Sequence, residues 1–331
     1  MKYLTWILCS LSALCTAATD VHDPHIIKDK DTYYIFSTGR MRRVISVIES
    51  KDLLSWTRSA DVFSAVPDWV KKEIPACREL WASDVHKIGD RFCLYYSAST
   101  FGSQRSFIGL ATNKTLDPNS PDFKWVDEGM VIESKPGMDF NAIDAGVLTD
   151  ADGRVWLTWG SFWGGIKLAE LNPKTGKLLS DTPTIHSIAR RKPPETAIEG
   201  AYLIYRHGFY YLFVSFDACC RGINSTYKIM VGRSKSPTGP YIDREGRPMA
   251  EGGGSLVLQT EGRWIGPGHN SVLCDGDDDF LVYHTYDAQN RGRPVLQIRP
   301  IEWTQDHWPT PGPILEPPSD PNTPPPATIP K

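Results

Sequence analysis

The sequence predicts an all-β protein folded as a five-bladed β-propeller. One observation is that five similar units follow one another, each with a polar or acidic opening residue, a short apolar strand, a turn and a second strand rich in Tyr, Phe or Trp. The other is that short strands recur at similar spacing, with no long helical period between them. Four strands in each of five units would form a closed ring that exposes few strand edges.

The first two strands of each unit can be followed along the chain. In order, the paired segments are 23–27 and 33–37, 84–88 and 92–97, 144–148 and 155–160, 199–204 and 209–214, and 269–273 and 280–284. Asp or Gly occurs in every turn between them. A third apolar strand follows in four units, at 44–48, 108–111, 166–169 and 229–232. The opening residues are 61, 60, 55 and 70 positions apart, as blades of similar size require.

The two ends of the chain differ from the repeated part. Residues 1–18 contain Lys2, an apolar run too short to span a bilayer, and small residues at the end, which is typical of a cleaved secretion signal. From Pro309 to Lys331, 10 of 23 residues are proline, which predicts a stiff tail or linker without a core. We therefore expect a secreted protein with its propeller domain at 19–308.

Composition and charge exclude several classes of protein. The 36 Lys and Arg against 39 Asp and Glu give a net charge of −3, which excludes binding of nucleic acid through bulk positive charge. No apolar run beyond the signal approaches the length of a membrane span. We expect a monomer with neither a nucleic acid nor a membrane as partner. The adjacent Cys219 and Cys220 are compatible with either a vicinal disulfide or two reduced thiols.

Charged side chains recur at the start of each unit. Because the first strand of a propeller blade runs beside the central axis, we expect the five opening residues to be equivalent and to converge at one end of that axis. They are Asp23, Asp84, Asp144, Glu199 and His269. Four carboxylates so close together would repel one another, so a function or a bound cation must require them.

This set of residues favours sugar chemistry. Hydrolysis of a glycosidic bond needs one carboxylic acid to protonate the leaving oxygen and one carboxylate to act on the opposite face of the sugar. A third carboxylate nearby can keep the acid protonated by repulsion. Aromatic residues make up 11% of the chain, and those that are not core residues would stack on sugar rings.

Eight short stretches resemble the family 43 glycoside hydrolases, and among these the endo-1,5-α-L-arabinanases. They are His22–His25, Leu80–Val85, Ser99–Ser103, Asn141–Asp144, Ser161–Gly165, Ile198–Gly200, Ala218–Gly222 and Gly266–Asn270. Their number, order and spacing make the resemblance specific. It implies an enzyme that hydrolyses arabinan with inversion of configuration.

The resemblance also implies roles for individual residues. Asp23 would be the general base that activates water, Glu199 the general acid, and Asp144 the group that raises the pKa of the acid. His269 resembles the ligand of an axial cation, usually calcium, whose other ligands would be mostly water because calcium prefers oxygen. The residues that match substrate-contacting positions are Trp81, Phe101, Gly102, Asn141, Ile143, Ser161, Phe162 and Trp163.

Other interpretations remain open at this point. Asp23 could be a turn residue, His269 a core histidine, and the aromatic residues part of the core; Asp84 matches no catalytic role, so we expect it to make structural hydrogen bonds. The same carboxylates would serve an exo-acting α-L-arabinofuranosidase or a β-xylosidase of the family. A sugar-binding propeller without activity would repeat one site in each blade, whereas these units open with different residues.

Overall fold

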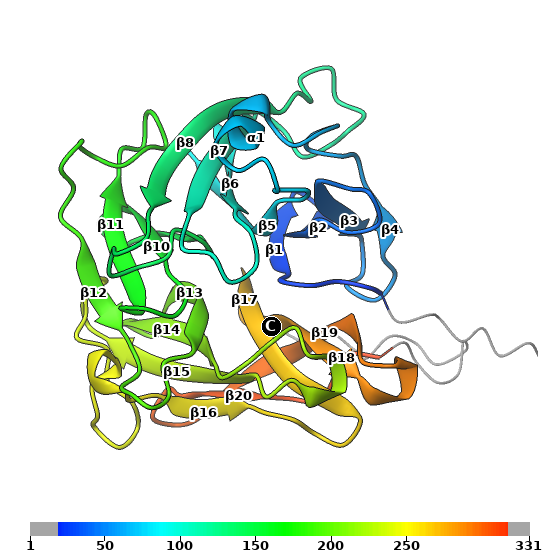
Figure 1. The fold of residues 1–331 in the computed structure, drawn as a ribbon. Coiled ribbons are helices and arrows are strands. Elements are labelled where there is room, and N and C mark those ends of the chain that lie inside the picture. The colour runs from blue at the N-terminus through cyan, green and yellow to red at the C-terminus, as the bar shows by residue number, and fades with distance from the viewer. Residues whose placement is uncertain (1–18, 317–331) are drawn as a thin grey trace, which may run out of the picture.

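The computed structural model describes residues 19–316 and confirms the five-bladed β-propeller (Figure 1). Each blade is an antiparallel sheet of four strands that follow in chain order from the axis outward.

Blade 1 contains β1 (His25–Asp29), β2 (Thr32–Thr38), β3 (Ile45–Ser50) and β4 (Thr57–Arg58), and blade 2 contains β5 (Trp81–Ile88), β6 (Arg91–Ala98), β7 (Ser106–Asn113) and β8 (Val126–Ser134). Blade 3 contains β9 (Gly146–Thr149), β10 (Val155–Trp159), β11 (Ile166–Leu171) and β12 (His186–Ala189). Blade 4 contains β13 (Ile198–Arg206), β14 (Phe209–Phe216), β15 (Lys228–Ser234) and β16 (Ser255–Leu258), and blade 5 contains β17 (Trp264–Asp275), β18 (Asp278–Asp287), β19 (Arg293–Trp303) and β20 (Pro309–Pro311).

Helices are short and lie between strands. They are α1 (Asp68–Glu73) and three single turns, η1 (Gly222–Asn224), η2 (Met249–Glu251) and η3 (Ala288–Asn290). Among the described residues, none forms a helix with the length and apolar character needed to cross a membrane.

The core lies between neighbouring blades. Among residues 19–316, each of five hydrophobic clusters joins side chains of two adjacent blades, so one cluster fills each interface of the ring. The second strands are therefore buried on both faces, as in β6 and β14, and this explains their continuous apolar and aromatic sequence. Much of the aromatic content belongs to this core, including Trp159, Tyr96 and Tyr211.

The ring closes where the first blade meets the fifth, which lie side by side in Figure 1. The first strand of every blade contacts the first strands of both neighbours, including β1 with β17. Ser271 Oγ of blade 5 donates to the Pro24 carbonyl at 3.0 Å and accepts from Ile26 N–H at 3.2 Å. The N-terminal segment adds a further bond, from Leu296 N–H to the Thr19 carbonyl at 2.9 Å.

The boundary predicted at residue 309 falls inside blade 5. Residues Pro309–Pro311 form β20, which pairs with β19, and Gly312 and Leu315 donate N–H bonds to the carbonyls of Pro300 and Ile298. These prolines are compatible with the sheet because β20 is the outermost strand, where an N–H can be missing from one side. The predicted signal at 1–18 and the rest of the tail, 317–331, lie outside the described residues.

A left-handed residue marks the start of each inner strand. The φ angles are 55° at Asp23, 41° at Ala82, 61° at Asp144, 60° at Gly200 and 45° at His269. In four of these, the backbone N–H donates to a side chain on the second strand of the preceding blade. The bonds are Asp23 to His284 Nδ1 (3.1 Å), Ala82 to Thr38 Oγ1 (3.0 Å), Asp144 to Ser97 Oγ (2.9 Å) and His269 to Ser215 Oγ (2.7 Å).

The prediction that all five opening residues are equivalent was wrong for Asp84 and Glu199. Glu199 pairs with Ser215 in the way that Trp81 pairs with Ser97, so Glu199 precedes the left-handed position by one residue. Asp84 follows that position by two residues. The pairing of β5 with β6 and that of β13 with β14 each contain a register shift at this point. Such a bulge changes which residues face the axis.

The first prediction concerns these bonds between blades. Replacing Ser215 by Ala leaves the partly buried N–H of His269 without its acceptor, so we expect a loss of about 1–3 kcal/mol in the free energy of unfolding. Urea denaturation measures it, with Ser180→Ala as a control at an exposed serine. Equal stability of the two variants would show that this hydrogen bond does not help to hold blade 4 and blade 5 together.

Candidate active site

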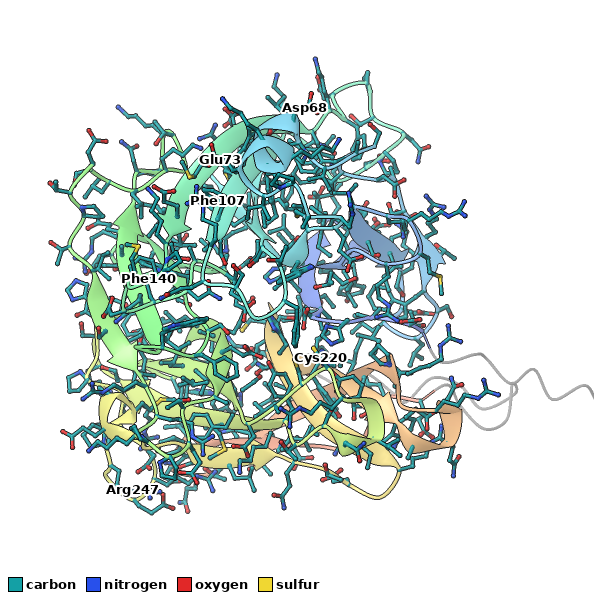
Figure 2. All side chains as sticks on the ribbon, viewed as in Figure 1. Asp68, Glu73, Phe107, Phe140, Cys220 and Arg247 are labelled. Carbon is teal, nitrogen blue, oxygen red and sulfur yellow. The ribbon has the colours of Figure 1, made fainter. Side chains whose placement is uncertain are left out.

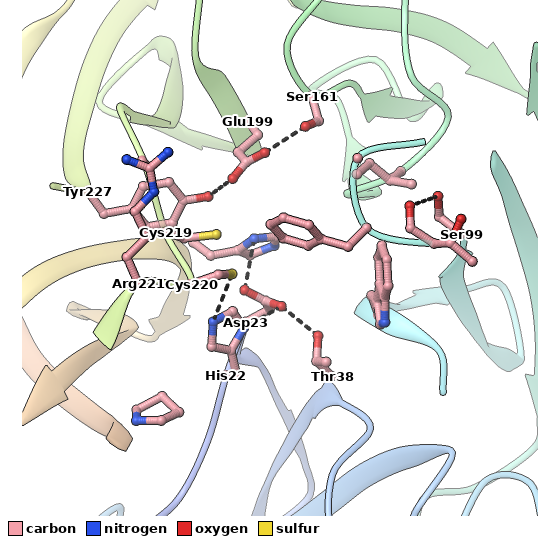
Figure 3. Close-up of a pocket in the computed structure, with 18 of the residues that line it drawn as sticks. His22, Asp23, Thr38, Ser99, Ser161, Glu199, Cys219, Cys220, Arg221 and Tyr227 are labelled. Carbon is pink, nitrogen blue, oxygen red and sulfur yellow. Dashed lines mark hydrogen bonds and ion pairs between the residues drawn. The ribbon is translucent and has the colours of Figure 1, made fainter. Parts of the chain in front are cut away.

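A cavity of ≈1250 Å³ lies over the starts of the inner strands. Residues from all five blades line it, among them Asp23, Trp81, Ile143, Glu199 and His269. Figure 3 shows Asp23 and Glu199 on different sides of this cavity. Asp23 lies just before β1 of blade 1, and Glu199 lies in β13 of blade 4. A turn residue, the alternative raised for Asp23, does not explain why Asp23 and Glu199 are buried carboxylates that face one cavity.

Asp23 is surrounded by hydrogen-bond donors. Its Oδ2 accepts from Thr38 Oγ1 at 2.5 Å and lies 2.8 Å from Nδ1 of His22, and its Oδ1 lies 3.3 Å from Nδ1 of His269. Burial alone would raise the pKa of Asp23, but the charges of His22 and His269 and the hydrogen bond from His22 outweigh it and hold the pKa well below its usual range. Asp23 is therefore a carboxylate. Because it is a weak base, it takes a proton only from a group that becomes strongly acidic during a reaction.

Glu199 has two donors and no basic side chain in direct contact. Ser161 Oγ donates to Glu199 Oε2 at 2.6 Å, and the Tyr227 hydroxyl donates to Oε1. Gly268 allows this arrangement, because a Cβ at that position would collide with the ring of Tyr227. Burial raises the pKa of Glu199, and the two hydrogen bonds only partly oppose the change.

Asp144 lies beside Glu199, but it does not itself line the cavity. Its Oδ2 accepts from the N–H of Gly200, the residue after Glu199, at 3.3 Å. Burial first, and then repulsion from Glu199 and Asp23, raises the pKa of Asp144 well above its usual range. Repulsion between two carboxylates acts on both, so the pair of Asp144 and Glu199 holds its proton to a higher pH than isolated carboxyl groups do.

All residues predicted to contact substrate line the cavity. They are Trp81, Phe101, Gly102, Asn141, Ile143, Ser161, Phe162 and Trp163. Phe101 is 84% exposed and Trp163 is 44% exposed, so these rings are not core residues. Asn141 and Ile143 are buried in the wall, where Asn141 accepts a hydrogen bond from Ser134 Oγ at 3.2 Å.

Several lining residues were not predicted to have a role. Tyr227, Thr38 and Tyr286 reach the cavity from second or third strands or from the loops next to them. Other lining residues had a signal in the sequence, because they belong to the matching stretches, as do His22 beside Asp23, Ser99 and Arg221. The contact between Tyr227 and Glu199 depends on the packing of blade 4 against blade 5, which no local pattern reports.

A second, smaller cavity continues along the axis beneath Asp23 and His269. The Val147 N–H donates to Asp84 Oδ2 at 2.5 Å there, so Asp84 makes the structural bond expected of it. The buried Asn270 amide and the Ser83 hydroxyl also line this cavity, and neither has a partner among the described residues. The cavity measures ≈10 Å³, about the space that one water molecule requires. Its oxygen atoms therefore suit a single ion or water beside His269, and any further water ligands of a calcium ion would have to lie outside this cavity.

His22, Asp23 and His284 also bring three potential ligand atoms within 4.8 Å of one another. Two of these side chains are already occupied by hydrogen bonds: His284 Nδ1 accepts from the Asp23 N–H, and His22 Nδ1 faces the Asp23 carboxylate. This group is therefore a hydrogen-bonded network around Asp23 and not a second metal site.

Comparisons with known proteins identify relatives of the chain. The family model described as glycosyl hydrolases family 43 matches residues 16–309. The extracellular exo-α-(1→5)-L-arabinofuranosidase ArbA of Cellvibrio japonicus is 41% identical over 314 residues, which cover 92% of this chain and 89% of that protein. The extracellular endo-α-(1→5)-L-arabinanase 1 of Bacillus subtilis is also 41% identical, over 88% of this chain and 87% of that protein.

Solved structures show the same fold. The α-L-arabinanase of Cellvibrio cellulosa in complex with arabinohexaose superposes with a TM-score of 0.85 and 40% identity, covering 89% of this chain and 96% of that one. The native arabinanase of Bacillus subtilis gives a TM-score of 0.79 at 40% identity, covering 88% and 98%.

The second prediction tests the raised pKa of Asp144. The folded state keeps a proton on this group that the unfolded chain releases above about pH 4, so the buried acid costs stability that increases as the pH rises. Asp144→Asn removes this cost and its amide oxygen can still accept from Gly200. We expect the melting temperature to rise by roughly 2 °C or more at pH 7, and by less at pH 4.

Differential scanning calorimetry at the two pH values measures this effect. The matched control is Asp181→Asn, at an exposed carboxylate, which should change neither value. If Asp144→Asn is no more stable than wild type at pH 7, the buried Asp144 carboxyl group does not lower the stability of the folded state, and the prediction is wrong.

Proposed function

The chain belongs to family 43 of the glycosyl hydrolases, and from that premise we propose that it cleaves internal α-1,5-L-arabinofuranosidic bonds of arabinan with inversion of configuration. One observation carries the proposal: two buried carboxyl groups whose pKa values shift in opposite directions, Asp23 downward and Glu199 upward, face one cavity. Asp144, whose pKa is also raised, lies behind Glu199. An inverting glycosidase needs an ionised base and a protonated acid on opposite faces of the sugar, with the carboxyl groups roughly 6.5–9.5 Å apart to admit a water.

Asp23 is the general base in this mechanism. Thr38 and His22 hold its carboxylate in place, and it takes a proton from the water that attacks the anomeric carbon. Because its pKa is far below neutral, Asp23 contributes mainly by orienting the water and by accepting the proton late, as the bond to carbon forms.

Glu199 is the general acid, which protonates the oxygen of the leaving sugar. Ser161 and Tyr227 fix the orientation of its carboxyl group. Asp144 keeps a proton available to the pair by repulsion and holds the backbone at Gly200, which positions Glu199. The role of Asp144 is thus electrostatic, in agreement with its place behind the cavity wall.

Endo action is supported by a relative that is named as an endo-arabinanase. The cavity also extends to residues of loops and strands in four blades, among them Met41, Phe101, Arg221 and Pro294, which is compatible with a polymer as substrate. The second candidate is exo action on the same bond, because a relative of equal identity is named as an exo-acting enzyme. In both cases Phe101, Phe162 and Trp163 offer exposed rings on which arabinosyl units can stack.

His269 and the axial cavity are the proposed calcium site. His269 Nδ1 faces Asp23, so Nε2 would be the atom that binds a cation, and Asn270 and Ser83 would offer oxygen atoms nearby. A divalent cation supplies positive charge that offsets the neighbouring carboxylates. We further propose that the protein is secreted, because the relatives described above are named as extracellular and residues 1–18 have the pattern of a signal.

The third prediction concerns the two acids. Asp23→Ala and Glu199→Ala should each reduce hydrolysis of linear arabinan by about a hundredfold or more, because general acid–base catalysis contributes about 10²–10⁴-fold. Reducing-sugar release measures the rate, and circular dichroism checks that each variant is folded. Asp181→Ala is the control. Retention of more than about a hundredth of the wild-type rate by either variant would contradict the role given to that residue.

The fourth prediction concerns the products. Linear arabinan should give a ladder of oligosaccharides at early times, and proton NMR should show the β-anomer, the inverted form, before mutarotation. Chromatography of the same samples separates endo from exo action, since exo action gives only one short product from the start. Formation of the α-anomer first would make Asp23 a nucleophile rather than a base.

The fifth prediction concerns the cation. Chelation, or the substitution His269→Ala, should lower the rate and shift the pH profile more than it lowers the melting temperature, because the ion acts on neighbouring pKa values. Calorimetric titration with calcium measures binding directly and should detect none in His269→Ala. A chelated sample with the wild-type rate and pH profile would leave His269 with a structural role only.

A further inference from the structure

Two adjacent cysteines border the cavity without a part in the mechanism above. Cys219 and Cys220 follow β14, and both line the cavity as free thiols. Cys220 is exposed and Cys219 is half-buried. Figure 2 shows Cys220 near the middle of the ring rather than at its periphery. In this structure no bond joins the two sulfur atoms.

Cys220 is connected to Asp23 through one imidazole ring (Figure 3). His22 Nδ1 lies 2.8 Å from Asp23 Oδ2, and His22 Nε2 lies 3.7 Å from Cys220 Sγ. The three side chains therefore have the order carboxylate, imidazole and thiol, in which the carboxylate fixes the ring and the ring activates the sulfur.

The Tyr286 side chain holds His22 and Cys220 next to each other. The Tyr286 hydroxyl is 2.9 Å from His22 Nε2 and accepts from the Cys220 N–H at 2.7 Å. Cys220 also has a left-handed backbone, with φ of 64°, which is uncommon for a residue other than glycine. A strained residue that is bonded at both its backbone and its side chain is typical of a functional position.

We propose that Cys220 is a reactive thiol that exchanges with low-molecular-weight disulfides, and that Cys219 resolves the product. The Cys220 thiolate attacks one sulfur of the external disulfide, so a new S–S bond forms and one thiolate leaves, to be protonated by water. Cys219 sulfur then attacks Cys220 sulfur, and the second external thiolate leaves with the proton that Cys219 releases. The cysteine pair is oxidised by two electrons, and the external disulfide is reduced to two thiols.

The electrostatics of the pair agree with this division of roles. A hydrogen bond from Cys219, together with the hydrogen bond and charge of His22, lowers the pKa of Cys220 to about 5. The same contact with Cys220, and burial, raise the pKa of Cys219 well above its usual range. Burial alone would lower the pKa of His22, but Asp23 raises it to about 10, so the ring is a cation beside the thiolate.

The resulting bond between neighbours should be easily reduced. Consecutive Cα atoms are about 3.8 Å apart across a trans peptide, below the roughly 4.4–6.8 Å that an unstrained disulfide spans. Strained and accessible disulfides belong to the labile, regulatory class. Because both sulfur atoms border the cavity that Asp23 lines, either an adduct on Cys220 or the strained bond would obstruct the site.

The remaining described cysteines provide internal controls. Cys77 and Cys93 are buried, whereas Cys274 is exposed but has no histidine partner. Burial, followed by the charge of Asp279, raises the pKa of Cys274 to about 12. Cys274 lies near the end of β17, away from the opening residues. Cys220 and Cys274 thus compare two accessible thiols that differ in their neighbours.

The experiment treats the enzyme with 5,5′-dithiobis(2-nitrobenzoate) at pH 7. Peptide mass spectrometry locates each adduct, and absorbance counts the thiolate released. We expect Cys220 to react at least about tenfold faster than Cys274, because its thiolate fraction is higher. Wild type should release two equivalents from this pair, and Cys219→Ser only one, with a stable adduct. Dithiothreitol should reverse the modification in both.

Hydrolysis of arabinan, relative to each untreated sample, gives the functional readout. Wild type and Cys274→Ser should lose at least about tenfold in rate when modified, whereas Cys220→Ser should keep its own untreated rate. His22→Gln should slow labelling of Cys220 about tenfold. Labelling does not require hydrolysis, so this proposal can be tested even if the proposed substrate is wrong.

Two results would overturn the proposal. One is labelling of Cys220 in wild type that is no faster than that of Cys274, which needs no variant to observe. The other is loss of activity in Cys220→Ser on treatment to the same extent as in wild type, which would assign the inhibition to another thiol.

Discussion

The structure of the site depends on a bond that recurs where one blade meets the next. One residue just before or within each inner strand is left-handed, and its N–H donates to a side chain of the preceding blade in four of the five blades. A left-handed residue other than glycine costs roughly 1–2 kcal/mol, about as much as one such bond contributes. The interface clusters must therefore hold these residues in place, and the strain is located where the functional side chains are.

The same bonds give the carboxylates different surroundings. Asp23 faces two imidazole rings and a hydroxyl, whereas Asp144 and Glu199 face each other and receive only neutral donors. Burial would protonate every one of these groups, so the neighbours decide which of them ionises. Similar residue types at similar positions thus acquire pKa values that shift in opposite directions, because the charges and hydrogen-bond donors around them differ.

The sequence predicts the blades well because each unit repeats the same local pattern of strand and turn. The resemblance to the family also predicts the cavity lining at Trp81, Phe101 and Trp163, of which Trp81 begins β5 and the other two lie in loops between strands. The register at Asp84 and Glu199 could not be derived, because a bulge moves a residue along the strand without a change in composition. The packing of Tyr227 on Glu199 and the return of residues Pro309–Pro311 to blade 5 depend on contacts between segments distant in sequence.

His22 connects two chemistries that the sequence does not associate. Its Nδ1 keeps Asp23 ionised, and its Nε2 is shared between Tyr286 and Cys220. The proton on the His22 ring stabilises the Asp23 carboxylate and the Cys220 thiolate. Oxidation of Cys220 removes the thiolate charge, which is one of the two negative charges that favour this proton. The pKa of His22 should then fall, and with it the charge that holds the pKa of Asp23 down. Oxidation of Cys220 would thus have two effects. It would raise the pKa of Asp23 through His22, and an adduct on the sulfur would obstruct the cavity.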